Sequence, residues 1–278
     1  MTDRLTTFDH DGLSFEVIDT GPLDGPVIIA LHGFPQRGSC WDGATPLLVA
    51  AGYRVLAPDQ RGYSPGARPG AIVAYRMDRL AGDVLALADA AGARSFHVLG
   101  HDWGGAVAWY LGSRHADRVR TLSVASTPHP RAMIAAMRGS QALRSYYMAL
   151  FQIPKLPEFL LRVRDGALLR RWLGGSGLLD LDNAVKLLAD PLTATGTINW
   201  YRSMRLRNAP GAGRVSIPTL YVWSDGDLAL GRRAATGTAD WVTGPYQFEI
   251  LAGASHWIPD ERPTELAQLV LDHLAAHG

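Results

Sequence analysis

The sequence predicts an α/β protein in which a mostly parallel central sheet is flanked by helices and interrupted by an inserted helical segment. Continuous apolar runs at 27–31 and 53–58 are typical of strands buried on both faces. A segment with helical spacing, 78–91, lies between strand signals, which predicts crossover connections and a parallel sheet. Between about 129 and 213 the strand signals stop, and they return at 219–223.

The composition is that of a soluble enzyme with a sizeable core. Of 278 residues, 47% are apolar and 19% are charged, which excludes a disordered chain. The formal net charge of +1 gives no sign of a nucleic-acid partner or of an anionic membrane surface. A single cysteine, Cys40, excludes an intramolecular disulfide and fits a reducing compartment.

The N-terminal residues contain no apolar signal segment. No run approaches the roughly 20 apolar residues that a membrane-spanning helix needs. We therefore expect a cytoplasmic protein, or at most one peripherally associated with a membrane, with no transmembrane segment. The sequence leaves its oligomeric state, monomer or homodimer, open.

The first part of the chain, residues 1–128, is expected to form most of the α/β core. Its predicted strands are 15–18, 27–31, 53–58, 96–99 and 119–125. Between 78 and 91 the apolar residues recur at the spacing of one helix face, and Gly92 ends that helix.

Residues 129–213 predict a helical cap inserted into this core, because they contain no pattern of a buried strand. The alternative is that they form further helices of the core. The last part, 214–278, completes the core with strands at 219–223 and 247–251. Pro263 is suited to the first turn of a final amphipathic helix.

The segment 100–105, Gly-His-Asp-Trp-Gly-Gly, lies between a predicted strand and a predicted helix. This is the arrangement of the nucleophile elbow of α/β-hydrolases, whose usual pattern is Gly-x-Ser-x-Gly. Here Asp102 stands where the serine would be, so a carboxylate would attack an sp³ carbon and form an alkyl ester that water then cleaves. The alternative is that Asp102 only caps the following helix.

A carboxylate nucleophile needs a base that activates water for the second step. His256 lies in the loop after the last predicted strand, where this fold places its base. Asp225 and Asp227 both follow the strand at 219–223, and either carboxylate could orient the imidazole. The order of nucleophile, acid and base along the chain is the one that this fold requires.

Backbone N–H groups are expected to bind the carboxylate oxygen and the tetrahedral intermediate of ester hydrolysis. One should belong to Trp103, directly after the candidate nucleophile. The other should come from the loop after the strand at 27–31, where Phe34 lies. The sequence thus predicts an oxyanion hole formed by Phe34 and Trp103.

Four segments together resemble the α/β-hydrolase-fold epoxide hydrolases. They are His-Gly-Phe-Pro-Gln at 32–36, Asp-Gln-Arg-Gly-Tyr-Ser at 59–64, the elbow at 100–105 and Ser-His-Trp at 255–257. The resemblance runs through the whole core and into the cap. It implies hydrolysis of an epoxide to a vicinal diol, through an ester on Asp102 and water activated by His256, with neither a metal nor an organic cofactor.

In this family two cap tyrosines donate hydrogen bonds to the epoxide oxygen as the ring opens. The segment 199–202, Asn-Trp-Tyr-Arg, resembles the one that carries one of them, so the resemblance assigns Tyr201. The segment 145–152 offers Tyr146 and Tyr147, and its Phe-Gln pair favours Tyr147. The family pattern likewise favours Asp227 over Asp225 as the acid, although the doublet leaves both in play.

The substrate is expected to be a small apolar epoxide that reacts with water in a largely apolar pocket. The residues assigned to this pocket are Met148, Phe151, Gln152, Leu228 and Trp257.

Two rival functions remain. A haloalkane dehalogenase shares the fold and the aspartate nucleophile, but it typically has Asn at the position of Phe34 and does not need Tyr201. A catalytically silent ligand-binding protein of the same fold need not keep nucleophile, acid and base together, as this sequence does.

Overall fold

The computed structural model describes residues 3–139, 141–206 and 211–278. Within them the strands form one eight-stranded sheet in the order β1-β2-β4-β3-β5-β6-β7-β8. The strands are β1 (Thr7–His10), β2 (Leu13–Thr20), β3 (Val27–Leu31), β4 (Arg54–Pro58), β5 (Phe96–His101), β6 (Val119–Ala125), β7 (Thr219–Ser224) and β8 (Tyr246–Leu251). Strand β2 pairs antiparallel with both β1 and β4. The other five neighbouring pairs are parallel, so the predicted mostly parallel sheet is confirmed.

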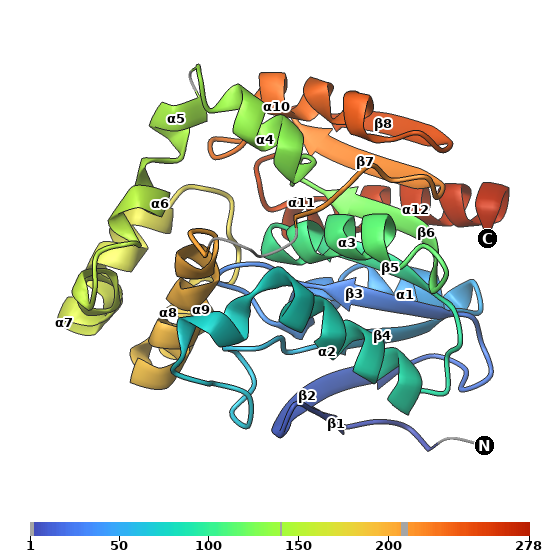
Figure 1. The fold of residues 1–278 in the computed structure, drawn as a ribbon, viewed down its shortest axis with the longest axis horizontal. Helices are drawn as coiled ribbons and strands as arrows, with labels where there is room; N and C mark the ends of the chain where they lie inside the picture. Colours follow the sequence, from blue (N-terminus) through green and yellow to red (C-terminus); the bar gives the residue numbers. More distant parts are fainter. Residues whose placement is uncertain (1–2, 140, 207–210) are drawn as a thin grey trace.

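Helices cover both faces of the sheet and extend beyond one end of it (Figure 1). The α-helices are α1 (Thr45–Ala50), α2 (Met77–Ala90), α3 (Trp103–Arg114), α4 (Pro130–Ala136), α5 (Gln141–Arg144), α6 (Tyr146–Leu150), α7 (Leu156–Leu173), α8 (Leu181–Ala189), α9 (Pro191–Ser203), α10 (Arg232–Thr236), α11 (Ile258–Glu261) and α12 (Pro263–His277). Three short 3-10 helices are η1 (Gly38–Trp41), η2 (Ile72–Tyr75) and η3 (Gly237–Trp241). As predicted, α12 begins at Pro263.

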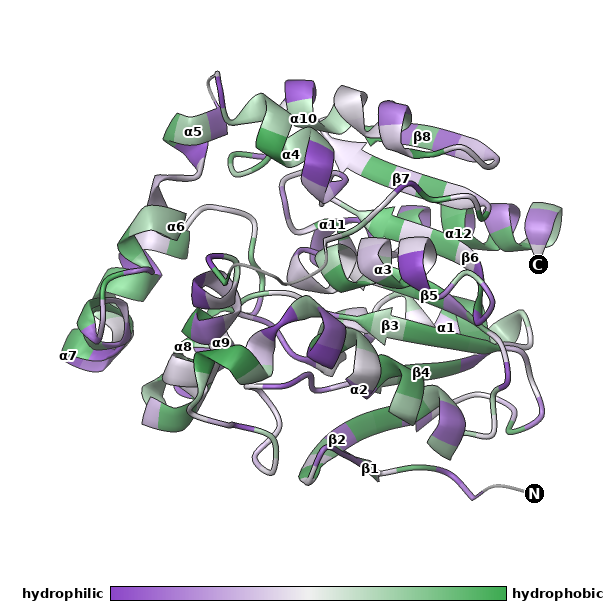
Figure 2. Cartoon of the chain, in the orientation of Figure 1, coloured by the Kyte–Doolittle hydropathy of each residue, from purple (hydrophilic) through white to green (hydrophobic). Residues whose placement is uncertain are grey.

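The core has two layers because neighbouring residues of a strand face opposite sides of a sheet. In β3, Ile29 and Leu31 belong to the apolar cluster that includes α2 and α3. Ile28 and Ala30 belong to the cluster that includes α1 and α12. Figure 2 shows the result as central strands that are mostly apolar along their length.

Between β6 and β7, the described residues form helices only, from α4 to α9. Figure 1 shows α5 to α9 beyond the end of the sheet, whereas α4 lies beside α10 of the core. The α7 segment contains two helices joined by non-helical residues at 163–166. The boundaries of the cap at 129 and 213 stay a prediction. Among the described residues, none of the helices has the length and apolar character needed to cross a membrane.

The cap helix α9 touches the core backbone to backbone. A Cβ on Gly62 would lie 2.9 Å from the carbonyl carbon of Gly196, so neither position has room for a side chain. One turn later, the indole Nε1 of Trp200 donates to the carbonyl oxygen of Arg61 at 2.8 Å. These contacts fix α9, and with it Tyr201, over the carboxyl ends of the central strands.

Candidate active site

Asp102 lies at the sharp turn between β5 and α3, with φ 50° and ψ −119°. The turn needs glycines, since a Cβ on Gly100 would lie 2.5 Å from the carbonyl oxygen of Gly104. A Cβ on Gly104 would lie 2.2 Å from the carbonyl oxygen of Leu31. The Asp102 side chain makes no capping hydrogen bond to α3, so its carboxylate is free for another role.

The loop after β3 approaches this carboxylate closely. The backbone N–H of Phe34 donates to Oδ1 of Asp102 at 2.7 Å. Trp103 is the first residue of α3, where backbone N–H groups have no partner within the helix. The structure therefore brings both predicted oxyanion-hole residues to Asp102, with Phe34 bonded to it directly.

The structure also brings His256 and Asp227 together. His256 Nδ1 lies 2.8 Å from Oδ2 of Asp227, and its Nε2 lies 3.5 Å from Oδ2 of Asp102. The other oxygen of Asp227 accepts from the N–H groups of Ala229 and Leu230, at 2.7 and 2.8 Å. Asp225 is exposed and binds the N–H of Gly253 instead. Asp227, the acid that the family pattern favours, is thus the one that meets the imidazole.

Charge pairing outweighs burial at His256 and at Asp102. Burial disfavours the imidazolium, but the carboxylates of Asp227 and Asp102 raise the pKa of His256 to about 10. Burial likewise disfavours ionised Asp102, yet His256, His101 and the Phe34 N–H hold its pKa below the ordinary value. The resting site is therefore an ion pair in which the Asp102 carboxylate carries a full negative charge.

The loop of His256 is held by two residues that the sequence analysis did not assign. His101 Nε2 and Ser126 Oγ lie 2.9 and 2.6 Å from the His256 carbonyl oxygen. Burial lowers the pKa of His101 to about 4, so its imidazole is neutral near pH 7. Both residues position His256 through its backbone and do not face the reacting atoms.

Two cap tyrosines reach the same cavity as Asp102. Tyr147 of α6 and Tyr201 of α9 both line it, and their ring centres lie 6.0 Å apart. Tyr146 is 61% exposed and does not line it. Burial, followed by the Asp102 charge, raises the pKa of Tyr147 and of Tyr201, so both phenols keep their proton for donation.

The cavity measures about 280 Å³ and is largely apolar. Of the predicted pocket residues, it contains Met148 and, from the oxyanion hole, Trp103. It also contains apolar residues that the sequence analysis did not assign, from the start of α2, from α4 and from the loops after α9 and β7: Met77, Pro130, Met133, Ile134, Met204 and Leu230. No spacing pattern could have found them, because α4 reaches the cavity only through its packing on α10 and η3.

The other predicted pocket residues do not line this cavity. Leu228 is 73% exposed, because the turn that binds Asp227 brings Leu230 inward instead. Phe151 is buried behind Tyr201, with ring centres 4.8 Å apart. The Gln152 amide donates to the carbonyl oxygen of Tyr201 at 3.0 Å, which supports α9.

Trp257 is also absent from the cavity wall, because its side chain is buried elsewhere. Its indole N–H donates to Ser176 Oγ at 2.9 Å. Its ring packs edge-on against His256, with centres 5.0 Å apart. Trp257 therefore supports the base and does not contact the ligand space.

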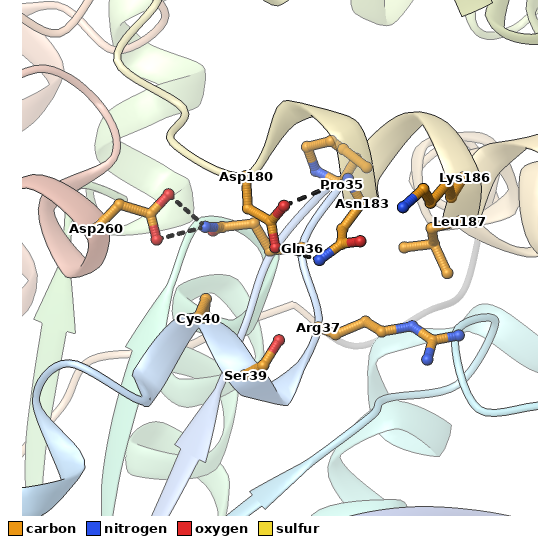
Figure 3. Close-up of a pocket in the computed structure, with 11 residues that line it drawn as sticks. Pro35, Gln36, Arg37, Ser39, Cys40, Asp180, Asn183, Lys186, Leu187 and Asp260 are labelled. Atoms are coloured by element: carbon orange, nitrogen blue, oxygen red, sulfur yellow. Dashed lines mark hydrogen bonds between the residues drawn. The ribbon is translucent and has the colours of Figure 1, made fainter. Parts of the chain in front are cut away.

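A second, polar cavity of about 470 Å³ contains none of the candidate catalytic residues. Figure 3 shows Gln36 pointing toward Asp260 across it, and the Gln36 amide donates to both Asp260 oxygens at 3.1 and 3.0 Å. Burial raises the pKa of Asp260 to about 6. Throughout the described residues, no group of three potential ligands could hold a metal ion.

Known proteins resemble this chain over most of its length. The alpha/beta hydrolase fold model matches residues 26–263. Epoxide hydrolase A of Mycobacterium tuberculosis is 34% identical, over 98% of this chain and 97% of its own. An AB hydrolase superfamily protein of Bacillus subtilis is 35% identical, over 95% of each chain.

Solved structures give the same result. The crystal structure of epoxide hydrolase A from Mycobacterium thermoresistibile is 28% identical, covers 98% of both chains and superposes with a TM-score of 0.85. An epoxide hydrolase from metagenomes of hot environments is 30% identical, covers both chains completely and has the same TM-score. The chain belongs to the α/β-hydrolase fold family and, within it, to the group that contains the epoxide hydrolases.

Proposed function

We propose that this protein hydrolyses an apolar epoxide to a vicinal diol in two steps, through an alkyl ester on Asp102. The observation that carries the proposal is one cavity that holds the Asp102 carboxylate and the phenols of Tyr147 and Tyr201. A carboxylate supplies the nucleophile, and protonated phenols supply donors for the oxygen that leaves carbon.

In the first step, Oδ2 or Oδ1 of Asp102 attacks one epoxide carbon from the side opposite to oxygen. The carbon–oxygen bond breaks and its electron pair goes to oxygen, which accepts a proton from Tyr147 or Tyr201. The product is an ester of Asp102 with the hydroxyalkyl group. Because Phe34 already binds Oδ1 at 2.7 Å, the attacking oxygen is most readily Oδ2.

In the second step, the imidazolium of His256 first loses its Nε2 proton through solvent to the phenolate that the first step left. Neutral His256 then takes a proton from water, and the resulting hydroxide adds to the ester carbonyl carbon. The N–H groups of Phe34 and Trp103 bind the oxyanion that forms. Collapse of this intermediate breaks the bond between the carbonyl carbon and the alkoxy oxygen. The departing alkoxide takes the proton of the new carboxyl group, which releases the diol and restores the Asp102 carboxylate. The proton taken from water stays on Nε2 of His256, whose Nδ1 is held by Asp227, and the imidazolium pairs again with Asp102 as in the resting site.

Ester formation prepares the base for this second step. The negative charge of Asp102 is one of the causes that raise the pKa of His256 to about 10. An ester carries no charge, so alkylation removes that cause and lowers the pKa of the imidazole. His256 thus becomes a better base only after the substrate is bound covalently.

A dehalogenase would use the same aspartate but would need donors for a departing halide. At the position where dehalogenases typically have Asn, this chain has Phe34, whose side chain is apolar and packs edge-on against Tyr201 at 5.8 Å between ring centres. The two phenols fit a departing alkoxide, which needs a proton, better than a halide, which needs none.

The deciding experiment is a single turnover of styrene oxide in H₂¹⁸O, followed by intact-mass analysis, with wild type and His256→Gln. Wild type should release the diol, and ¹⁸O should appear in an Asp102 carboxylate oxygen. The His256→Gln variant should accumulate an ester at Asp102. Halide release from 1-bromobutane, without diol formation from any epoxide, would show that the protein is a dehalogenase.

A further inference from the structure

The near-neutral charge of the whole chain conceals an uneven distribution. Residues 129–213 contain twelve Lys and Arg against five Asp and Glu, a formal net charge of +7. The rest of the chain contains the remaining fifteen basic and twenty-one acidic residues, a net charge of −6. The net charge of the whole chain gave no sign of an anionic surface as partner. That expectation holds for the chain as a whole, but the cap by itself is strongly positive.

The positive charge extends to the part of the cap farthest from the sheet, formed by α5, α6 and α7 (Figure 1). We call residues 141–176 the cap tip. It contains six basic and two acidic residues, and all six basic side chains are exposed: Arg144, Lys155, Arg162, Arg164, Arg170 and Arg171. Over the described ranges, only Arg170 of these six forms an ion pair, with Asp182.

The cap tip also exposes apolar side chains. A groove of about 140 Å³ runs between α6 and the two halves of α7, with leucines, aromatic residues and a proline as its lining. Tyr146 and Leu168 line this groove and are themselves exposed, and Phe159 on α7 is 61% exposed. Figure 2 shows apolar and hydrophilic residues side by side on α7.

The groove is next to the candidate active site. Tyr147 lines both the groove and the cavity that contains Asp102. Its neighbours on α6 divide between the two, since Tyr146 faces the groove and Met148 the cavity. One short helix thus separates the apolar surface of the cap tip from the proposed site of reaction.

We propose that the cap tip docks on an anionic lipid surface. Exposed arginines and lysines are attracted to acidic headgroups, and apolar side chains between them enter the boundary with the acyl chains. A second copy of this chain is the poorer occupant, because a two-fold contact would place two such positive surfaces against each other. Docking would present the groove to apolar epoxides that partition into the bilayer.

The test is co-sedimentation with lipid vesicles in the absence of substrate, so it succeeds or fails independently of the proposed reaction. One set of vesicles is pure phosphatidylcholine, and the other contains about 30% phosphatidylglycerol. At low salt we expect about tenfold more protein on the anionic vesicles. Raising NaCl from about 50 to about 300 mM should release most of it, because salt screens exposed charges.

Two double variants with the same change in net charge locate the surface. Arg164→Glu with Arg171→Glu alters the cap tip, and Arg94→Glu with Arg120→Glu alters exposed arginines of the core. The first pair should lose binding about tenfold or more, and the second should keep it. Equal loss in both pairs would mean attraction by net charge alone and would overturn the proposal.

A matched apolar pair tests the second component. Phe159→Ser should weaken binding several-fold, whereas Leu47→Ser on α1 should not. All variants should keep wild-type hydrolysis of a water-soluble epoxide, which shows that they are folded. Absence of any preference for anionic vesicles would overturn the proposal. So would a dimer in sedimentation velocity that Phe159→Ser dissociates, since the surface would then be an interface between copies.

Discussion

Gly33 lies directly beneath the carboxylate of Asp102: a Cβ at Gly33 would stand 2.2 Å from the Cβ of Asp102 and 2.3 Å from its Oδ1. The absence of a side chain at one residue therefore determines where the other can place its oxygens. The same loop supplies the Phe34 N–H, so position and hydrogen bond come from two consecutive residues.

Gly33→Ala should accordingly reduce catalysis more than stability. The added methyl group must push the Asp102 side chain away from Phe34, and a misplacement of about 1 Å can cost ~10²-fold in rate. Overpacking should cost about 1–3 kcal/mol of folding free energy. The measurements are the rate of ester formation and the melting temperature. The control is Gly70→Ala, because a Cβ at Gly70 would have no atom within 4 Å. A Gly33→Ala enzyme with wild-type rates would refute this account.

Removing the proposed proton donors should slow ring opening. Tyr201→Phe and Tyr147→Phe should each reduce the rate of ester formation by roughly 10²-fold or more, since general acid catalysis contributes about 10²–10⁴-fold. Rapid-quench mass analysis measures the rate at which the Asp102 adduct appears. Tyr146→Phe is the control, because that side chain is exposed. If Tyr146→Phe slowed ester formation and Tyr147→Phe did not, the donor on α6 would be Tyr146 and not Tyr147.

Asp227 and Asp225 should differ sharply when each is changed to Asn. Asp227→Asn removes the charge beside His256 Nδ1, so ester hydrolysis should slow by about 10²-fold or more while ester formation continues. Asp225→Asn changes an exposed loop carboxylate and should leave both steps intact. The adduct should therefore accumulate in the first variant only, as seen by intact mass. Accumulation in both would remove the distinction that the geometry draws.

The pKa of His256 should depend on the charge of Asp102. NMR titration should place it near 10 in wild type, where both carboxylates raise it. It should be lower by at least about one unit in Asp102→Asn, where the side chain is neutral as in the ester. An unchanged value would show that Asp102 does not control the base.

The same shift makes stability depend on pH. The folded pKa of His256, about 10, exceeds the value of about 6.5 for an unfolded histidine. The stabilisation is therefore complete below pH ~6.5 and is lost as pH rises toward the folded pKa. Between pH 7 and 10 the melting temperature of wild type should fall more steeply than that of His256→Gln, because the variant lacks the titrating group. Parallel curves for the two proteins would contradict the linkage.

Sequence order and local chemistry predicted the sheet and the turn that carries Asp102. The alternation of strands and helices predicted the parallel sheet, and the glycines around Asp102 predicted the tight turn after β5. Both features depend on residues that are neighbours in the chain. Strand β1 was not predicted, since four residues at a sheet edge carry little periodic signal. The spacing of Asp225 and Asp227 could not separate them, because the choice depends on a turn that only the structure shows.

The cavity wall was predicted least well. An apolar residue near the site can equally face a ligand, as Met148 does, or support a neighbour, as Phe151 does behind Tyr201. Leu228 and Leu230 are alike in type and two residues apart, yet one is exposed and the other lines the cavity. Such differences arise from tertiary packing, which overrides the local pattern.

The close approach of Gly62 and Gly196 gives the two proposed proton donors different supports, since only Tyr201 lies on the helix that it holds. Tyr201 belongs to the helix that is held against the core backbone, so its hydroxyl keeps its place relative to Asp102. Tyr147 belongs to α6, at the outer part of the cap (Figure 1). Any rearrangement that admits a bulkier substrate must therefore change the span between the two hydroxyls. If both phenols donate as proposed, the range of substrate sizes and the protonation of the leaving oxygen depend on the same distance.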